Sequence, residues 1–308
     1  MESTNTHIEY RVTNDYDNQK VSQILRSCLK LSRGEMRRIK RSAGLMVNEQ
    51  TVRLNALVKE GDLIRVNLQD DGDQPVIPQD IPLNILFEDD HILVVNKPPD
   101  MLVHPLSYHV LNTLANGVIY HWQLQGHNSK FRSVSRLDKD TSGVILIAKS
   151  SYICHQLSVQ MKNSMCRREY LAVVHNRITM DSGIIDFPIG RLYDHSLIFG
   201  VTSQGKEAIT HFTVIERFSS GSLVKLRLET GRTHQIRVHM RHLGHPLMGD
   251  ELYGGSLDLI NRQALHSWCL EFNHPVTKEH MRLEASLPAD MTSLIYKLKT
   301  VPIKEYIL

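Results

Sequence analysis

One short apolar run constrains the fold of this chain more than any other feature. It is VILIA, residues 144–148, a continuous stretch rich in β-branched side chains, which predicts a strand covered on both faces. The preceding segment, RLDKDTSG at residues 136–143, has the charged and small residues of a turn. Rigid strands often hold loops that present catalytic groups, and Asp138 has such a position, although a lone Asp here would more simply be a surface cap. The other segments have to decide between these interpretations.

The length and composition indicate a globular protein of more than one domain. A chain of 308 residues is long enough for one large and one small domain. No apolar run approaches the roughly 20 residues that span a bilayer, and the N-terminal sequence lacks the basic start and apolar core of a signal peptide. Four scattered cysteines without a CxxC pair fit reduced thiols. We therefore expect a soluble cytoplasmic protein with no membrane partner.

Positive charge is concentrated near the N-terminus, although the formal net charge of the whole chain is only +3. Residues 26–41 include seven Lys and Arg residues and a single acidic residue, Glu35. Such a run is usually a solvated helix face, but it is also typical of nucleic-acid-binding surfaces, where phosphate contacts supply much of the affinity. We predict RNA or DNA contact through this cluster, which consists of Arg26, Lys30, Arg33, Arg37, Arg38, Lys40 and Arg41.

Changes in pattern along the chain predict its domain organisation. Residues 13–70 read as a small domain in which two short basic helices precede three short strands. Ser32 and Glu35 have the spacing of a capping box for the second helix. Residues 1–12 are predicted to form a tail or an edge strand. The two remaining units are an exposed acidic linker at 71–82, which should not bind RNA, and a large domain at 83–300.

Three further segments of the large domain have patterns that suit functional loops. NKPPDMLVHP, residues 96–105, has a double proline that fixes a rigid loop after a strand. CRREYLAVV, residues 166–174, places Tyr170 near the start of a strand, where Tyr is usually half-buried. LETGRTHQIRVHMRHLG, residues 228–244, predicts a strand followed by a helix that Thr233 caps and Gly244 ends.

Histidines in the third segment raise the alternative of a metal site. His239, His242 and His245 follow at three-residue spacing, which would place helical neighbours on a shared face. His245 lies beyond Gly244, however, and no pattern of carboxylates accompanies the three histidines. We therefore predict that they are RNA-facing or satisfied polar residues and that the chain has no metal site.

Together with the Asp138 loop, these segments resemble the RluA-type pseudouridine synthases over roughly residues 83–295. SRLDKDTSG resembles the active-site loop of that family, REYLAVV its second motif and GRTHQIRVHMRHLGHPLMGDELYG its third. NKPPDMLVHP and the closing LHSWCLEFNHPVTKEHMRLEASLP fit its flanking patterns. The resemblance implies an α+β fold, namely the pseudouridine synthase fold, with a mixed, mostly antiparallel sheet and a central cleft. It also implies isomerisation of uridine in RNA to pseudouridine without a cofactor.

Residues 13–70 resemble the alpha-L RNA-binding domain, a small α/β module named after a small-subunit ribosomal protein. The matching parts are the basic second helix, a turn at Asn48 and the closing GDLIRV. Glu49 stands where Gly is usual in that family, so we expect the turn to differ in detail. The combination of this domain with a synthase domain recurs in the RluA-type family and implies RNA as the partner.

The resemblance implies a role for each matched residue. Asp138 matches the catalytic Asp, which attacks the sugar, attacks the base or removes a ribose proton, and the sequence does not choose among these steps. Arg237 matches its basic partner, whose charge within about 4–6 Å would keep the carboxylate ionised. Tyr170 would stack on the base and help to remove its carbon-5 proton. Ile236 would pack beneath the base, and Arg136 would fill the space in the base stack that the flipped base leaves. Phosphates would be held by Arg232 together with Arg37, Arg38 and Arg41.

Two positions depart from the family pattern. Ser135 replaces the usual His before Arg-Leu-Asp, where related synthases also vary. Asp100 replaces the usual Gly after Lys-Pro-Pro. Because Gly at that position suggests a positive φ, which Asp tolerates better than most residues, we expect only a local adjustment.

Two other functions remain open from the residues alone. A catalytically idle RNA-binding or ribosome-assembly factor could keep the fold, but binding needs none of Asp138, Tyr170 and Arg237. A hydrolase could pair Asp138 with Asp140 or with another carboxylate, although two carboxylates on one loop need not converge. For an isomerase, the alpha-L resemblance favours large-subunit ribosomal RNA over transfer RNA. Nothing in the sequence suggests more than a monomer.

Overall fold

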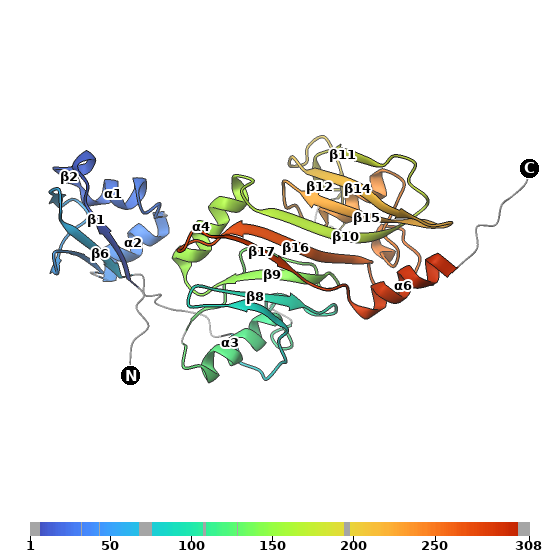
Figure 1. Cartoon of the computed structure of the whole chain (residues 1–308), viewed down its shortest axis with the longest axis horizontal. Helices are drawn as coiled ribbons and strands as arrows, with labels where there is room; N and C mark the ends of the chain where they lie inside the picture. Colours follow the sequence, from blue (N-terminus) through green and yellow to red (C-terminus); the bar gives the residue numbers. More distant parts are fainter. Residues whose placement is uncertain are drawn as a thin grey trace, which may run out of the picture.

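The computed structural model consists of a large sheet with its helices and a smaller N-terminal unit beside it (Figure 1). It describes residues 7–31, 33–42, 44–67, 76–106, 109–127, 129–193 and 198–300. No helix within these ranges combines the length and the apolar character that crossing a bilayer requires.

The N-terminal unit has a hydrophobic core of its own. Ile24 and Leu25 from its first helix pack there with Leu45 and Ile64 from its sheet. Strand β1 pairs antiparallel with β6, so the unit begins before residue 13, where the sequence pattern placed its start. The elements are β1 (His7–Arg11), a 3-10 turn (Asn14–Tyr16), β2 (Gln19–Lys20), α1 (Val21–Ser27), α2 (Arg33–Ser42), β3 (Leu45–Val47), β4 (Gln50–Thr51), β5 (Leu57–Val58) and β6 (Leu63–Asn67).

The turn between β3 and β4 contains Asn48 and Glu49. Asn48 has a φ of 48° and Glu49 a φ of 67°, the two positive values that a type I′ hairpin turn requires. The Asn48 side chain accepts a hydrogen bond from the Leu63 backbone N–H at 2.9 Å and donates one to Asp62 at 2.8 Å. These bonds hold the turn in place although Glu, rather than Gly, occupies its second position.

The basic helix α2 is described in its backbone and in part of its side chains. Arg37 is exposed on it. The predicted capping residue Ser32 lies outside the described residues, and so do the side chains of Arg38 and Arg41. Five of the seven basic residues of the cluster thus belong to α2, while Arg26 lies in α1 and Lys30 lies between the two helices.

The second half of the predicted linker is docked rather than free. Ile77 accepts a hydrogen bond from the Asn116 side chain at 2.7 Å, and the Gln79 backbone N–H donates to the Asn116 carbonyl at 3.1 Å. Asn116 is fully buried in α3 (Leu114–Leu124), which Thr113 caps at its N-terminus. Residues 76–82 thus lie against the large domain, while residues 71–75 are outside the described ranges.

Within the described residues, the large sheet has nine strands in the order β11-β14-β15-β10-β16-β9-β8-β7, with β17 paired to β16. All of its pairings are antiparallel except that of β16 with β9. This confirms the predicted α+β class with a mixed, mostly antiparallel sheet. The strands are β7 (Ile85–Glu88), β8 (Ile92–Lys97), β9 (Ser142–Ala148), β10 (Arg167–His175), β11 (Ser182–Asp186), β14 (Ile209–Arg217), β15 (Gly221–Leu228), β16 (Leu265–Asn273) and β17 (His280–Glu284); β12 (Ile189–Arg191) and β13 (Phe199–Val201) form a separate pair.

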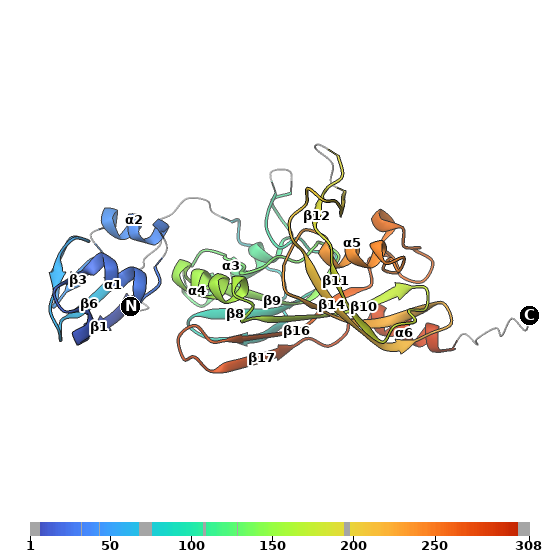
Figure 2. The ribbon, with the colours of Figure 1, turned by 90° about the horizontal axis from the view of Figure 1, so that it is seen from above.

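Helices pack against both faces of each half of the sheet, and Figure 2 shows α5 and α6 on opposite sides of the strands that they cover. Every residue of β9 is buried, because α3 packs on Ile145 and Ile147 while α4 (Ser151–Lys162) packs on the alternate residues. This confirms the strand predicted from VILIA. In the other half, α5 (Gln235–His242) packs with Tyr170 and Leu226 on one face, and α6 (Ala289–Thr300) packs with Val173 and other residues on the opposite face.

Helix α4 also connects the large domain to the N-terminal unit. Gln156 donates a hydrogen bond to the Leu29 carbonyl at 3.3 Å. Tyr152 packs against the core of the N-terminal unit and against the core beneath α4. The N-terminal unit, which contains the basic helix, is therefore attached to the large domain through side-chain contacts as well as through the chain.

Candidate active site

The loop before β9 places Asp138 beside Arg237 from α5. Arg237 Nη1 lies 3.2 Å from Asp138 Oδ2, and the other edge of the guanidinium binds both oxygens of Asp250, at 2.7 and 2.8 Å. Burial alone would lower the pKa of Arg237, but its bonds to Asp250 and Asp138 hold that pKa above the usual value. One charged arginine thus joins a buried carboxylate to a more exposed one.

Aromatic contacts complete the surroundings of Arg237. Its guanidinium lies over the ring of Tyr253, 4.8 Å from the centroid. The Tyr253 hydroxyl lies 2.8 Å from His234 Nδ1, and His234 Nε2 lies 3.9 Å from Asp138 Oδ2. Burial lowers the pKa of His234, so the imidazole is largely neutral at neutral pH. Arg237 is therefore held on two sides before any substrate is present.

The start of α5 differs from its prediction. His234, in the left-handed region at a φ of 56°, occupies the N-cap position predicted for Thr233, and no side chain caps the helix there. The side chain of Gln235 bonds instead to the preceding loop, where its oxygen accepts from Thr230 Oγ1 at 2.8 Å and from the Arg232 backbone N–H at 2.9 Å. This buried amide fixes the loop that leads into Arg237, so a hydroxyl cap is not needed.

A buried lysine binds the backbone of the Asp138 loop. Lys97 at the end of β8 is 0% exposed, and its ammonium donates to the carbonyls of Pro98, Met101 and Lys139 at 2.8–2.9 Å. These three bonds use every proton that an ammonium group has. Burial lowers the pKa of Lys97 to about 7, against the attraction of Asp140. The rigid loop predicted from the double proline is thereby joined to the Asp138 loop.

The two halves of the sheet meet next to Asp138. Strand β9 pairs with β16 only through Ser142 and Gly143, which align with His266 and Ser267. Gly143 has a φ of 112°, and a Cβ there would lie 2.1 Å from the Ser267 carbonyl oxygen. Only glycine permits so close an approach of two backbones. The candidate site therefore lies at the junction of the halves.

Tyr170 lies where β10 departs from a regular register. Its pairing with β16 shifts between Glu169 and Tyr170, and such irregularities often re-aim a side chain beside an active site. Tyr170 is buried in the cluster that includes Ile236, with Leu137 packed against it. Burial raises the pKa of Tyr170, and the charge of Asp138 adds to this effect. The phenol therefore stays protonated at neutral pH.

The structure brings only some of the predicted site residues together. Asp138, Arg237, Tyr170 and Ile236 share one region through the contacts above. Arg136 is exposed on the same loop, near enough to His104 for its charge to lower the pKa of that imidazole, after burial. The remaining predicted phosphate contacts lie elsewhere: Arg232 bonds through Nε to the Glu207 carbonyl at 2.7 Å, and Arg37 lies on α2.

The histidines of α5 have ordinary structural partners. His239 is fully buried, and its two nitrogens lie 2.9 Å from Thr210 Oγ1 and 3.0 Å from the Phe187 carbonyl oxygen. His242 packs against the ring of Phe187. In the described part of the chain, no group of His, Cys, Asp and Glu residues could hold a metal ion.

Asp100 supplies a direct test of backbone strain in the Lys-Pro-Pro loop. Its φ is 57°, the positive value that the sequence predicted. Replacing Asp100 by Ala should lower the free energy of unfolding by about 1 kcal/mol relative to Asp100→Gly, because both variants lose the exposed ion pair with Lys139 and only Ala is disfavoured in this conformation. Urea denaturation of the two variants measures the difference, and equal stabilities would contradict it.

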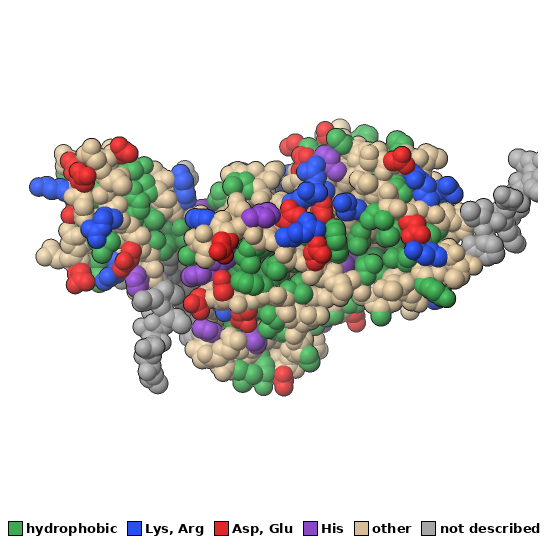
Figure 3. All heavy atoms as spheres, viewed as in Figure 1, with side chains coloured by type: hydrophobic (Ala, Val, Ile, Leu, Met, Phe, Trp, Pro, Cys, Tyr) green, Lys and Arg blue, Asp and Glu red, His purple; other side chains and the backbone are tan. Residues whose placement is uncertain are grey.

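Charged side chains cover the face of β10 opposite Tyr170. Arg167, Glu169, Glu271, Arg282 and Glu284 form ion pairs along and across neighbouring strands, in the region where Lys, Arg, Asp and Glu side chains gather in Figure 3. A cavity of about 290 Å³ on this face includes Arg167 and Glu169 in its lining. Because successive side chains alternate along a strand, this cavity is separate from the Asp138 site.

Sequence reasoning missed several residues that shape the site. Asp250 is 1% exposed and binds Arg237 from a loop thirteen positions later. Tyr253 and His234 complete the surroundings. All three belong to the third quoted motif, so their places in it were visible, but nothing in the spacing indicated that Asp250 folds back on Arg237. Lys97 stood in the quoted Lys-Pro-Pro segment, and its burial had no signal in the sequence.

The fold defines the class of protein. A solved human structure named RNA Pseudouridylate Synthase Domain Containing 1 aligns with 75% of this chain and 99% of its own length, at a TM-score of 0.56 and 26% identity. The large sheet with its helices thus has the fold of the pseudouridine synthases.

Sequence comparison then defines the family. Residues 91–242 match the family described as RNA pseudouridylate synthase. The uncharacterized RNA pseudouridine synthase YjbO of Bacillus subtilis is 46% identical over 252 residues, which cover 82% of this chain and 89% of that protein. Ribosomal large subunit pseudouridine synthase D of Pasteurella multocida is 39% identical over 79% of each chain. The chain belongs to the RluA-type RNA pseudouridine synthases, which are isomerases that act on RNA.

Proposed function

We propose that this enzyme isomerises a specific uridine of large-subunit ribosomal RNA, with Asp138 as its catalytic group. The observation that supports the assignment of Asp138 is its 3.2 Å contact with Arg237, an arginine that Asp250 and Tyr253 already hold in place. Such a carboxylate is oriented before substrate arrives, and this preorganisation is what a catalytic group needs. Binding of RNA alone would not require it.

The reaction needs three actions from the protein. The bond between the base and the ribose must break, the base must turn, and a carbon–carbon bond must form at uracil carbon 5, from which a proton leaves. Asp138 would act on the sugar or the base, and Arg237 would supply the positive charge beside it. The proposal leaves three roles open for the carboxylate, namely attack on the sugar, attack on the base or removal of a ribose proton.

Tyr170 and Ile236 would form the surface on which the uracil rests. They pack in one cluster next to the Asp138 loop, and aromatic rings stack on bases that have been flipped out of a helix. Because burial raises the pKa of Tyr170, its hydroxyl would act as a hydrogen-bond donor or through a bound water, rather than as a phenolate.

Replacing Tyr170 by Phe tests this role. The substitution keeps the ring and its packing, so RNA affinity should stay at the wild-type level, while the turnover rate should fall about 100-fold, the usual scale of proton-transfer catalysis. Single-turnover assays with saturating enzyme measure the rate. A Phe variant with the wild-type rate would restrict Tyr170 to packing.

The remaining basic residues would hold the RNA. Exposed Arg136, on the catalytic loop, would take the place of the flipped base, since a planar guanidinium can stack where an ammonium cannot. Arg232 would contact phosphates near α5. We propose that the N-terminal unit is an alpha-L RNA-binding domain whose helix α2 presents Arg37, Arg38 and Arg41 to the backbone, which would make binding sensitive to salt.

The proposed substrate class rests on the alpha-L resemblance and on relatives named as ribosomal large subunit pseudouridine synthases. Transfer RNA is the second candidate. We further propose that the enzyme acts as a monomer in the cytoplasm.

Tritium release tests the proposal directly. RNA labelled at uracil carbon 5 is prepared from cells that lack the enzyme, and its large-subunit ribosomal and transfer RNA fractions are incubated separately with the purified protein. We expect stoichiometric release from the ribosomal fraction. Release from the transfer RNA fraction alone would support the second candidate substrate. No release from either fraction, with RNA binding intact, would support the assembly-factor alternative.

A further inference from the structure

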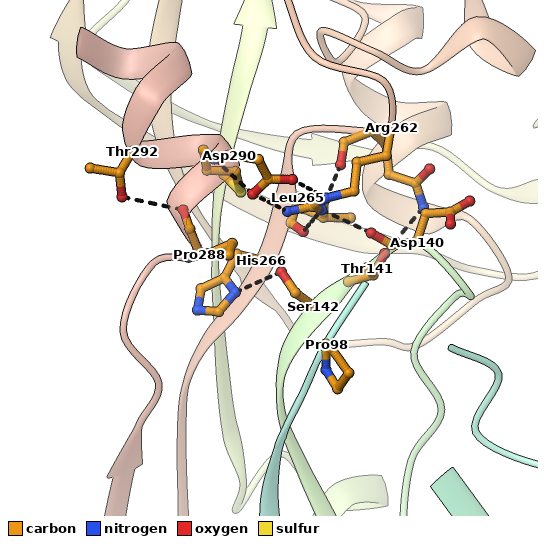
Figure 4. A network of polar contacts seen from close by, with 12 residues as sticks. Pro98, Asp140, Thr141, Ser142, Arg262, Leu265, His266, Pro288, Asp290 and Thr292 are labelled. Atoms are coloured by element: carbon orange, nitrogen blue, oxygen red, sulfur yellow. Dashed lines mark hydrogen bonds and ion pairs between the residues drawn. The ribbon is translucent and has the colours of Figure 1, made fainter. Parts of the chain in front are cut away.

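Arg262 connects the Asp138 loop to a distant part of the fold. It lies in the segment before β16, and its side chain is almost fully buried. Nη1 donates to the carbonyl of Asp140 at 2.8 Å, and also to those of Gln263 and Leu265 at 3.1 and 3.3 Å. Figure 4 shows this side chain between the Asp140 loop and the start of α6.

The other edge of the same guanidinium binds Asp290 in the first turn of α6. Arg262 Nε lies 2.6 Å from Asp290 Oδ2, and Nη2 lies 2.9 Å from Oδ1. Burial would raise the pKa of Asp290, but the bonds from Arg262 hold it below its usual value. Such a bidentate pair fixes the plane of the guanidinium, and with it the direction of Nη1 toward Asp140.

Helix α6 is itself held firmly. Met291, Leu294 and Leu298 are buried in the core that includes Val173 and Leu223. The Asp290 carboxylate also accepts a hydrogen bond from the Met291 backbone N–H at 2.8 Å. The carboxylate that orients Arg262 therefore has a fixed position relative to the large sheet.

The loop that receives this contact has little freedom left. The Asp138 carbonyl accepts from the Thr141 backbone N–H at 3.1 Å, and that of Lys139 accepts from Lys97 and from the Met101 backbone N–H. The Asp140 carbonyl accepts from Arg262. Three successive carbonyls of the loop thus each accept a hydrogen bond. The donors lie, in order, in the loop itself, in the Lys-Pro-Pro segment and in the segment before β16.

We infer that Asp290 and Arg262 are positioning residues for Asp138. The ion pair with Asp290 on α6 orients the Arg262 guanidinium, and the guanidinium binds the Asp140 backbone carbonyl. The pair thereby fixes the direction in which the Asp138 side chain points toward Arg237. This inference rests on the proposed function, since it assumes that Asp138 acts on uridine. A displacement of a catalytic group by about 1 Å can cost 100-fold in rate, so the pair should affect the chemical step more than RNA binding.

Asp290→Asn tests the inference because it keeps the shape of the side chain and removes its charge. We expect the single-turnover rate at saturating enzyme to fall about 10- to 100-fold, with the RNA dissociation constant unchanged. Asp290→Glu, which keeps the charge, should recover part of the lost rate. Lys299→Gln is the matched control, because it breaks another ion pair of α6, with Glu216 at 2.8 Å, that does not reach the loop.

The outcomes separate positioning from simple stabilisation. A lowered thermal midpoint for Asp290→Asn together with a wild-type single-turnover rate would overturn the inference. Equal rate losses in Asp290→Asn and Lys299→Gln would overturn it too, because they would reflect general loosening of α6. If Asp290→Asn does not fold, Asp290→Glu carries the test, with a smaller loss in the same rate. Absence of tritium release by the wild-type enzyme would instead contradict the proposed function itself.

Discussion

Replacing Asp138 by Asn should lower tritium release by roughly 10³-fold or more, because an amide can neither attack carbon nor accept a proton as a carboxylate does. The substitution keeps the size of the side chain and leaves the loop backbone with its donors. RNA affinity should therefore stay at the wild-type level. Tritium release and filter binding on the same preparations measure the two quantities. A variant that retains measurable turnover would remove Asp138 from the chemical step.

Asp140→Asn distinguishes the isomerase from a hydrolase with paired carboxylates. A hydrolase that used Asp138 and Asp140 together should lose its activity in either variant. The contact of Asp140 with Arg262 is made by its backbone carbonyl, which Asn retains, so an isomerase that depends on Asp138 alone should keep most of its rate.

Replacing Arg237 by Met should cost both stability and activity. Asp250 is 1% exposed and binds the guanidinium through both oxygens. Removal of one partner from a buried pair leaves an uncompensated charge and costs about 3–5 kcal/mol. Asp138 also loses the positive charge beside it, so turnover should be lost. Urea denaturation and tritium release measure the two effects, and a stability loss below about 1 kcal/mol would contradict the first.

The double variant Arg237→Met with Asp250→Leu separates these effects. Replacing a buried ion pair with apolar residues of similar volume is often neutral for stability. We therefore expect the double variant to regain most of the lost free energy of unfolding without regaining activity. Recovery of turnover together with stability would show that Arg237 acts only in holding the fold.

Features of the fold that depend on a few neighbouring residues, such as one buried strand and one backbone angle, could be predicted from the sequence. The continuous apolar run VILIA predicted a strand that is buried on both faces. The structure confirms it, with α3 on one face and α4 on the other. The positive φ of Asp100 followed from the residue that it replaces. The sequence of β1, HIEYR, is compatible with a tail or an edge strand because its alternation is weak, and in the structure its residues are half-buried or exposed.

Side-chain partners from distant segments could not be predicted in this way. Asp250 and Asp290 each bind an arginine through both oxygens, but neither carboxylate belongs to a periodic pattern. The helix cap predicted at Thr233 was wrong because the buried amide of Gln235 supplies the bonds of that loop. The spacing of Ser and Thr residues along the sequence cannot show that Gln235 takes this role, because the role depends on where the Thr230 side chain lies in the folded protein.

The narrow junction between β9 and β16 has a consequence for how the protein is made. The paired residues Ser142 and His266 are 124 positions apart, and pairing at such separation is slow because the entropy of closing a long loop opposes it. A nascent chain can pair β8 with β9 soon after both emerge, since domains begin to fold during synthesis. The strand that places Arg237's half of the sheet against Asp138's half arrives much later. Most of the chain must therefore be synthesised before the two halves of the catalytic centre can be brought together.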